Sequence, residues 1–390
     1  MNIIIRQTAA EDRSALVEFF NLAFPGQHRY PERWEWLYKN NPFLPAGFGV
    51  PSWTALDGER IIGHTGAMLV PVTFRGQTVL AAWSVDTYLL PEARGCGVGK
   101  ALQAANQHAH RLFMSLEMSP VNRAIKKKLG GEDGPATALF YRPLKVLYQQ
   151  VSEEVTNGLQ HRFGRVGTMI ALAGSVGGWQ ILCRYLDRQI SRRDTACPFS
   201  SRHFSLMPVS GRFGDAADEL WSRVRERYTF AVERTSCYLN WKYFEQPFMP
   251  HQSYYVVEGD TVQGLLVLRC GNPADEPPLG VISECYLVHP TAERYQELVA
   301  MALELLVEQG VVGIWAASAD EVLESVLASQ GFFSLRREPM VLHSAEGIPA
   351  PGQPALLSKG DHDWDQYPNL RQPSVQQLVS LAMRRKTIPG

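Results

Sequence analysis

The sequence predicts an α/β (α+β) protein with two tandem domains, each a mixed, mostly antiparallel sheet flanked by helices. Two observations lead to this prediction. A glycine-rich loop joins a strand to a helix within residues 82–105, behind several strand-like segments. An aromatic-rich stretch near the N-terminus, together with the strands after it, recurs in the second half of the chain. A repeat of this length indicates two copies of one folding unit.

Composition describes an ordinary globular protein. The chain has 390 residues, enough for two or three domains with their own cores, and a net charge of −1. No long polybasic span is present, which argues against a nucleic-acid partner. The six cysteines are scattered without a CxxC pair, so we expect no zinc or other metal site, no disulfide framework and a reducing cytoplasm. The N-terminus lacks the apolar segment of a signal peptide.

The first predicted domain, residues 1–145, opens with a short strand at Ile3–Arg6. Thr8 and Glu11 stand at capping-box spacing before a helix, and a second helix around Trp34–Tyr38 ends at Asn41. Alternating segments then predict strands, ending with one at Ala82–Leu90, and further strands and a helix after the glycine loop. The remaining predicted elements are the strands Trp53–Leu56, Arg60–Val70, Val72–Phe74, Val79–Ala82, Leu112–Met118 and Ala138–Arg142, and the helix Ser119–Leu129.

The glycine loop predicts a phosphate site. Its glycines leave backbone amides uncovered, and the following helix adds its positive dipole end. A P-loop is excluded because Arg94 and Ala101 occupy two of its required positions. A dinucleotide fingerprint is excluded because Lys100 stands where the third glycine belongs. What remains is Arg94-x-x-Gly97-x-Gly99, with a plain strand-to-helix turn as the structural alternative.

This pattern, directly after a strand, resembles the acyl-CoA loop of the GNAT N-acyltransferase superfamily. The order of elements over residues 1–145 is also similar to that family's. The resemblance implies acetyl-CoA or another acyl-CoA as co-substrate, with its pyrophosphate on the loop amides and a backbone amide near Leu89 polarising the thioester carbonyl. The residues implied to hold the acyl-CoA are Tyr88, Leu89, Leu90, Arg94, Gly95, Cys96, Gly97, Val98, Gly99, Lys100 and Asn122.

The family's usual acid and base do not carry over. Many relatives place a Tyr in the helix after the second splayed strand, and that position falls on Lys126 here, so the usual acid is missing. Asp86 and Glu117 lie on the two strands that would splay and are the candidate catalytic carboxylates. Asp86 is preferred, with an ordinary structural carboxylate as its alternative. For Lys126–Lys128 we favour a solvated helix face over contact with the nucleotide phosphates.

Residues 146–200 are predicted as a helical linker. Within it, residues 166–183 carry no charge and reach the lower length of a membrane span. Four glycines and several polar residues weaken that interpretation. We therefore favour a packed helix or helical hairpin between the domains over membrane contact.

Residues 201–345 are predicted as a second, degenerate GNAT-like domain. Its loop position reads His289–Tyr295 without glycine, so we expect it to shape the acceptor pocket or a homodimer rather than to hold CoA. Residues 346–390 form a Pro-rich linker and tail, in which we favour a solvated turn at Asp361–Asp365 over a cation or metal site. Five residues of the first domain recur at one constant offset: Trp36, Tyr38, Pro42, Phe43 and Pro45 as Trp241, Tyr243, Pro247, Phe248 and Pro250.

The sequence therefore predicts an N-acyltransferase, in particular an N-acetyltransferase. It would move an acyl group from acyl-CoA to a primary amine of a small polar molecule such as an amino sugar. The alternative is a non-catalytic acyl-CoA-sensing or scaffolding protein, which the missing Tyr favours. The intact glycine loop favours the enzyme, because a pure scaffold has little use for it.

Overall fold

The computed structural model describes residues 3–24, 29–145, 202–269 and 278–363, with a few residues between 152 and 184 and between 372 and 377. The apolar segment 166–183 falls almost entirely outside these residues, as do Asp365 and most of residues 375–386, which the sequence predicts as a short amphipathic helix. Among the described helices, none is long and apolar enough to cross a membrane.

The described strands form one continuous mixed sheet of 14 strands, running from β1 at one edge to β7 at the other. The first half holds β1 (Ile3–Gln7), β2 (Ser52–Asp57), β3 (Arg60–Phe74), β4 (Gln77–Leu89) and β5 (Leu112–Ser115). The second half holds β12 (Gly313–Ser318), β11 (Leu279–Leu287), β10 (Thr261–Arg269), β9 (His251–Glu258) and β7 (Ser205–Pro208). The short strands β8 (Phe230–Val232) and β14 (Ala355–Leu356) pair with each other, and β8 also pairs with β3.

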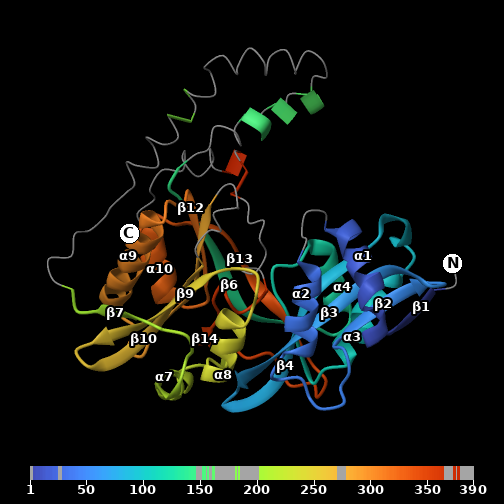
Figure 1. The fold of residues 1–390 in the computed structure, drawn as a ribbon, viewed down its shortest axis with the longest axis horizontal. Coiled ribbons are helices and arrows are strands. Elements are labelled where there is room, and N and C mark those ends of the chain that lie inside the picture. The colour runs from blue at the N-terminus through green and yellow to red at the C-terminus, as the bar shows by residue number, and fades with distance from the viewer. Residues whose placement is uncertain are drawn as a thin grey trace.

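The two halves exchange their last strands at the centre of the sheet (Figure 1). Strand β6 (Glu132–Pro143) ends the first half in sequence but pairs with β12 of the second half. Strand β13 (Phe333–Ser344) ends the second half and pairs with β5 of the first. The two strands also pair with each other. Each half therefore completes its sheet with a strand of the other, and neither has a free edge at the junction.

Helices cover both halves in the same order. The first half has α1 (Arg13–Ala23), α2 (Tyr30–Trp34) with a π-helical turn at Glu35–Lys39, α3 (Val98–His108) and α4 (Pro120–Lys128). The second has α7 (Asp215–Arg225), α8 (Ser236–Leu239) with a π-helical turn at Asn240–Phe244, α9 (Ala292–Glu308) and α10 (Glu321–Ser329).

Two details differ from the sequence prediction. Strand β3 joins the predicted strands Arg60–Val70 and Val72–Phe74 into one, and β4 likewise runs unbroken from the predicted strand Val79–Ala82 to Leu89, so β3 and β4 form one long hairpin. The first helix is not opened by Thr8, whose hydroxyl accepts a hydrogen bond from Ser52. Asp12 instead accepts from the amide of Ala9, 2.8 Å away.

The repeated aromatic stretches meet each other. The rings of Trp36 and Trp241 stack with centroids 4.5 Å apart and planes 10° from parallel. Each indole N–H donates to the backbone carbonyl of the other tryptophan, at 2.9 and 3.3 Å. Both side chains are buried. The tryptophans that mark the repeat in the sequence are thus also a contact between the two halves. The contact has local two-fold symmetry, because each tryptophan makes the same interactions with the other.

Because both indoles lose their stacking partner and a hydrogen bond together, Trp36→Ala and Trp241→Ala should each cost about 3–5 kcal/mol in the free energy of unfolding. The double variant should cost clearly less than the sum, since the contact can be lost only once. Denaturant unfolding followed by circular dichroism measures this. The exposed Leu22→Ala is the control, with a change within about 0.5 kcal/mol. Additive losses would contradict the pairing.

Candidate active site

Strands β4 and β5 separate and leave a wedge. They pair in parallel only at Ala82 with Phe113 and at Trp83 with Met114. Beyond Trp83 the two strands diverge, and a cavity of about 550 Å³ opens between the end of β4, the start of α3 and the start of α4. Its lining residues are Thr87, Tyr88, Leu89, Arg94, Gly95, Gly97, Gly99, Lys100, Leu102, Gln103, Ser119, Val121, Asn122 and Ile125.

The glycine loop presents backbone amides to this cavity. Gly95 and Gly97 have φ of +83° and +81°, a conformation that suits glycine. A Cβ added at either position would meet nothing within 4 Å, so packing does not require glycine there. Gly97 is the N-cap of α3 and supplies no side-chain hydrogen bond. The first amides of α3 therefore face the cavity without a side-chain cap, as an anion site requires.

The strand wall of the cavity suits a polar linear ligand. The amide of Leu90 donates to Ile62 of β3 at 2.9 Å, and N–H groups alternate along a strand, so the amide of Leu89 is directed to the wedge side. Arg94 Nε donates to the carbonyl of Leu89 at 3.1 Å, and its guanidinium lies over the Tyr88 ring, 5.5 Å from the centroid. The Leu89 amide, next to the Arg94 guanidinium, can therefore bind a linear ligand that contains amide groups and ends in phosphates.

The structure brings most of the predicted acyl-CoA residues together. Eight of them line the cavity: Tyr88, Leu89, Arg94, Gly95, Gly97, Gly99, Lys100 and Asn122. Leu90 and Val98 are buried beside it, and Cys96 is exposed in the loop. Sequence reasoning missed Thr87 and Gln103, which are joined by a hydrogen bond of 3.3 Å. The helical position of Gln103, one turn after Gly99, was the available signal.

Asp86 and Glu117 do not line the cavity. Both have positive φ, +50° and +52°, and so mark the points where the two strands bend apart. Asp86 is buried, accepts from the Arg33 guanidinium at 3.1 Å and from the Tyr38 hydroxyl at 3.2 Å. Glu117 pairs with Lys359; burial opposes its charged form, but this ammonium outweighs burial and lowers its pKa. Their catalytic role stays a prediction, and these ion pairs favour a positioning role.

A second, matching cluster lies in the other half. Glu284 occupies the place of Asp86 and accepts from the Tyr243 hydroxyl at 2.8 Å, as Asp86 does from Tyr38. Arg234 lies 3.4 Å from Glu284, and all of these side chains are buried. Burial raises the pKa of Glu284 to about 7. The repeat thus includes a buried Tyr–carboxylate–Arg cluster in each half.

The segment 357–363 connects the two clusters. Asp363 lies 2.5 Å from Arg33, and Asp361 lies 2.7 Å from Arg234. Both carboxylates are buried, so the expectation of a solvated turn is wrong for these two residues. No group of His, Cys, Asp and Glu among the described residues could hold a metal ion. The partners are far away in sequence, so no local pattern could have indicated them.

His362 of the same segment reaches the wedge. Its Nε2 lies 3.1 Å from the carbonyl oxygen of Ser84, and its Nδ1 lies 2.6 Å from Asp363. Burial disfavours the imidazolium, but the Asp363 carboxylate outweighs burial and raises the pKa of His362 above 6.5. The imidazolium donates to the carbonyl at the point where β4 leaves β5.

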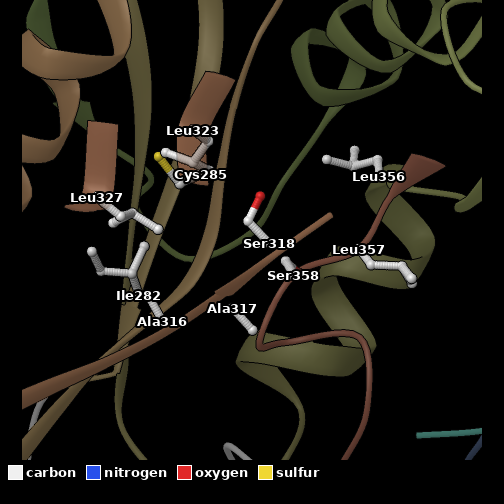
Figure 2. A pocket seen from close by; sticks show the side chains of 10 residues that line it. All are labelled: Ile282, Cys285, Ala316, Ala317, Ser318, Leu323, Leu327, Leu356, Leu357 and Ser358. Atoms are coloured by element: carbon white, nitrogen blue, oxygen red, sulfur yellow. The ribbon is translucent and has the colours of Figure 1, made fainter. Parts of the chain in front are cut away.

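In the second half, the corresponding wedge is filled by the chain itself. The amide of Gly360 donates to Ser283 of β11 at 2.9 Å, and the amide of Ala319 donates to Leu357 at 3.3 Å. Figure 2 shows the residues around the small pocket that remains here, with Ser358 beside Ser318 of β12; residues of β11, β12 and α10 and the segment 356–358 line it, and its volume is about 10 Å³. At the loop position, the Thr291 side chain caps α9 by accepting from the amide of Arg294. The second wedge therefore has no room for an acyl-CoA.

The comparisons identify the fold. No family model matches the chain, and neither does any curated protein. Among solved structures, the GCN5-related N-acetyltransferase from Anabaena variabilis aligns with a TM-score of 0.56 at 11% identity, over 88% of this chain and 73% of that one. Saccharomyces cerevisiae N-myristoyltransferase with bound myristoyl-CoA gives 0.55 at 11%, over 87% and 82%. A tandem GNAT protein of the clavulanic acid pathway gives 0.51 at 14%, over 90% and 100%. The predicted fold class, two tandem GNAT-like domains, is confirmed.

Calorimetric titration with CoA should find one site per chain. Gly97→Trp should weaken binding at least about 100-fold, or about 2.8 kcal/mol, because the side chain would enter the cavity and cover the amides. Gly76→Trp is the matched control: Gly76 also has φ of +81° and open space around it, but lies in the β3–β4 turn. Two sites, or equal affinities for both variants, would contradict the assignment.

His362→Gln should reduce stability in a pH-dependent way. Because the folded pKa of His362 is raised, its contribution is fully present below pH 6.5 and is lost as pH rises through the folded value. The difference in unfolding free energy from wild type, measured by urea unfolding, should therefore shrink as the pH rises above 6.5. The exposed Leu22→Ala, which removes no titratable group, should show no such trend. A constant difference would indicate that His362 is neutral in the folded state.

Proposed function

We propose that the chain is an acyl-CoA-dependent N-acyltransferase, in particular an N-acetyltransferase acting on a primary amine of a small polar molecule. The observation that carries this proposal is the wedge cavity, into which an uncapped helix start, a glycine loop and a strand amide all point. Fold neighbours named as an N-acetyltransferase and an N-myristoyltransferase support acyl transfer as the reaction class.

The donor would lie along the cavity with its phosphates on the first amides of α3 and its pantetheine arm beside β4. The Leu89 amide would then donate to the thioester carbonyl and stabilise the negative charge that develops on its oxygen. Attack by a neutral amine forms the C–N bond, and collapse of the tetrahedral intermediate breaks the C–S bond. The acceptor must lose one proton, and the departing sulfur gains one.

The inner end of the wedge supports a short acyl chain. Phe113 and Trp83 are buried where β4 and β5 still pair, and Lys126 lies over the Phe113 ring, 4.5 Å from its centroid. His362 covers the backbone at Ser84. These side chains occupy the space into which a long acyl chain would have to continue, so an acetyl group fits better than a fatty acyl group.

The test is thiol release from acyl-CoA in the presence of panels of amines, amino sugars and peptides. We expect turnover of acetyl-CoA with at least one amine class, and at least about tenfold slower turnover of myristoyl-CoA because the wedge is closed at its inner end. Gly97→Trp supplies the inactive control and Gly76→Trp the active one. CoA binding without thiol release across the panels would overturn the enzyme and favour acyl-CoA sensing.

A further inference from the structure

Lys126 is a buried lysine with an unusual position. The helix α4 was expected to present Lys126–Lys128 to solvent, and this is wrong for Lys126, which is only 2% exposed. Lys127 and Lys128, the next residues of the same helix, are exposed. Since an ammonium group is costly to bury, its surroundings need an explanation.

The contacts of Lys126 place its Nζ between the two strands of the wedge. It donates to the Ser84 hydroxyl of β4 at 3.1 Å and to the Gln103 carbonyl oxygen of α3 at 2.6 Å. It also lies over the ring of Phe113 of β5. Ser84 is the first residue of β4 after the last parallel pair with β5, and Gln103 lines the cavity. Lys126 itself does not line the cavity; its ammonium lies directly behind the lining residue Gln103, to which it is hydrogen-bonded, at the closed end of the donor cavity.

We propose that Lys126 is the proton donor to the thiolate that leaves when an acyl thioester in this wedge is transferred. The acyl carbon forms its bond to the amine nitrogen, the C–S bond breaks, and the sulfur takes a proton from Nζ. The neutral Lys126 regains a proton as the amine nitrogen loses one, so protons are neither gained nor lost over the whole reaction. This inference rests on the proposed function and adds a catalytic residue to it.

The chemistry of the site suits this step. Burial lowers the pKa of Lys126 to about 7, so the group can give up its proton near neutral pH and regain it. Its hydrogen-bond acceptors are the hydroxyl of Ser84 and the side-chain amide oxygen of Gln103, and neither would hold the positive charge as a carboxylate does. The other ionisable groups nearby already have partners: Asp86 with Arg33, Glu117 with Lys359, and His362 with Asp363.

The experiment uses the full chain, with Lys126→Met as the test variant and Lys128→Met as the matched control on the exposed face of the same helix. The first readout needs no acceptor amine. Bound CoA is titrated by the ultraviolet absorbance of its thiolate, with desulfo-CoA as the blank. If Nζ contacts the sulfur, the thiol of bound CoA should ionise at least about one pH unit lower in wild type and Lys128→Met than in Lys126→Met.

The second readout is kinetic. Lys126→Met should lower kcat at least about 100-fold while the affinity for CoA changes less than about threefold, and Lys126→Tyr should restore part of kcat and move the alkaline limb of the pH profile upward. An unshifted bound thiol, or a kcat of Lys126→Met within threefold of wild type, would overturn the proposal. Loss of CoA affinity or melting temperature in parallel with kcat would overturn it in favour of a structural role.

The two proposals fail in different ways. Absence of thiol release by wild type, with the shifted bound thiol intact, would overturn the acyltransferase reaction while supporting the contact between Lys126 and the sulfur. Turnover by wild type with an unshifted thiol would support the reaction and overturn the role of Lys126.

Discussion

The buried ion pairs of segment 357–363 are the constraint on which the two halves depend. Asp363 binds Arg33 in one half and Asp361 binds Arg234 in the other, with all four side chains away from solvent. Removing one member of such a pair leaves a buried charge uncompensated, at a cost of about 3–5 kcal/mol. Carboxylates at the alternate positions 361 and 363 allow the segment to pass between the two halves and pair with Arg234 on one side and Arg33 on the other. The segment therefore fixes the spacing of the two domains.

The same segment makes the two wedges different. Its first residues fill the wedge of the second domain through Leu357 and Gly360, whereas its later residues touch only the inner end of the first wedge through His362. The wedge of the first domain is therefore open, and the corresponding wedge of the second domain is closed. The exchange of β6 and β13 adds to this arrangement, because neither half can move without breaking strand pairs of the other.

Local pattern was enough to predict most of the residues that the structure brings together at the wedge cavity. The spacing Arg94-x-x-Gly97-x-Gly99 and the strand before it indicated the loop and the helix start that line this cavity, and the constant offset of the tryptophans indicated the repeat. What could not be predicted depends on partners distant in sequence. The burial of Lys126 is decided by Ser84 and Gln103, and that of Asp363 by Arg33. From sequence alone, a charged residue is expected to face solvent unless its partner is known. Helical and strand periodicity do not indicate that partner.

The starts of α3 and α9 explain why only one loop kept its glycines. In the second domain, the Thr291 hydroxyl accepts a hydrogen bond from the backbone amide of Arg294, so this amide at the start of α9 needs no ligand as its acceptor. In the first, Gly97 leaves the equivalent amides without a side-chain cap, which costs the isolated helix only about a few tenths of a kcal/mol. A Ser or Asp at that position would restore the cap but would place an oxygen where a phosphate oxygen should bind. The uncapped helix is therefore the less stable choice for the free protein and the better one for a chain that binds an anion there.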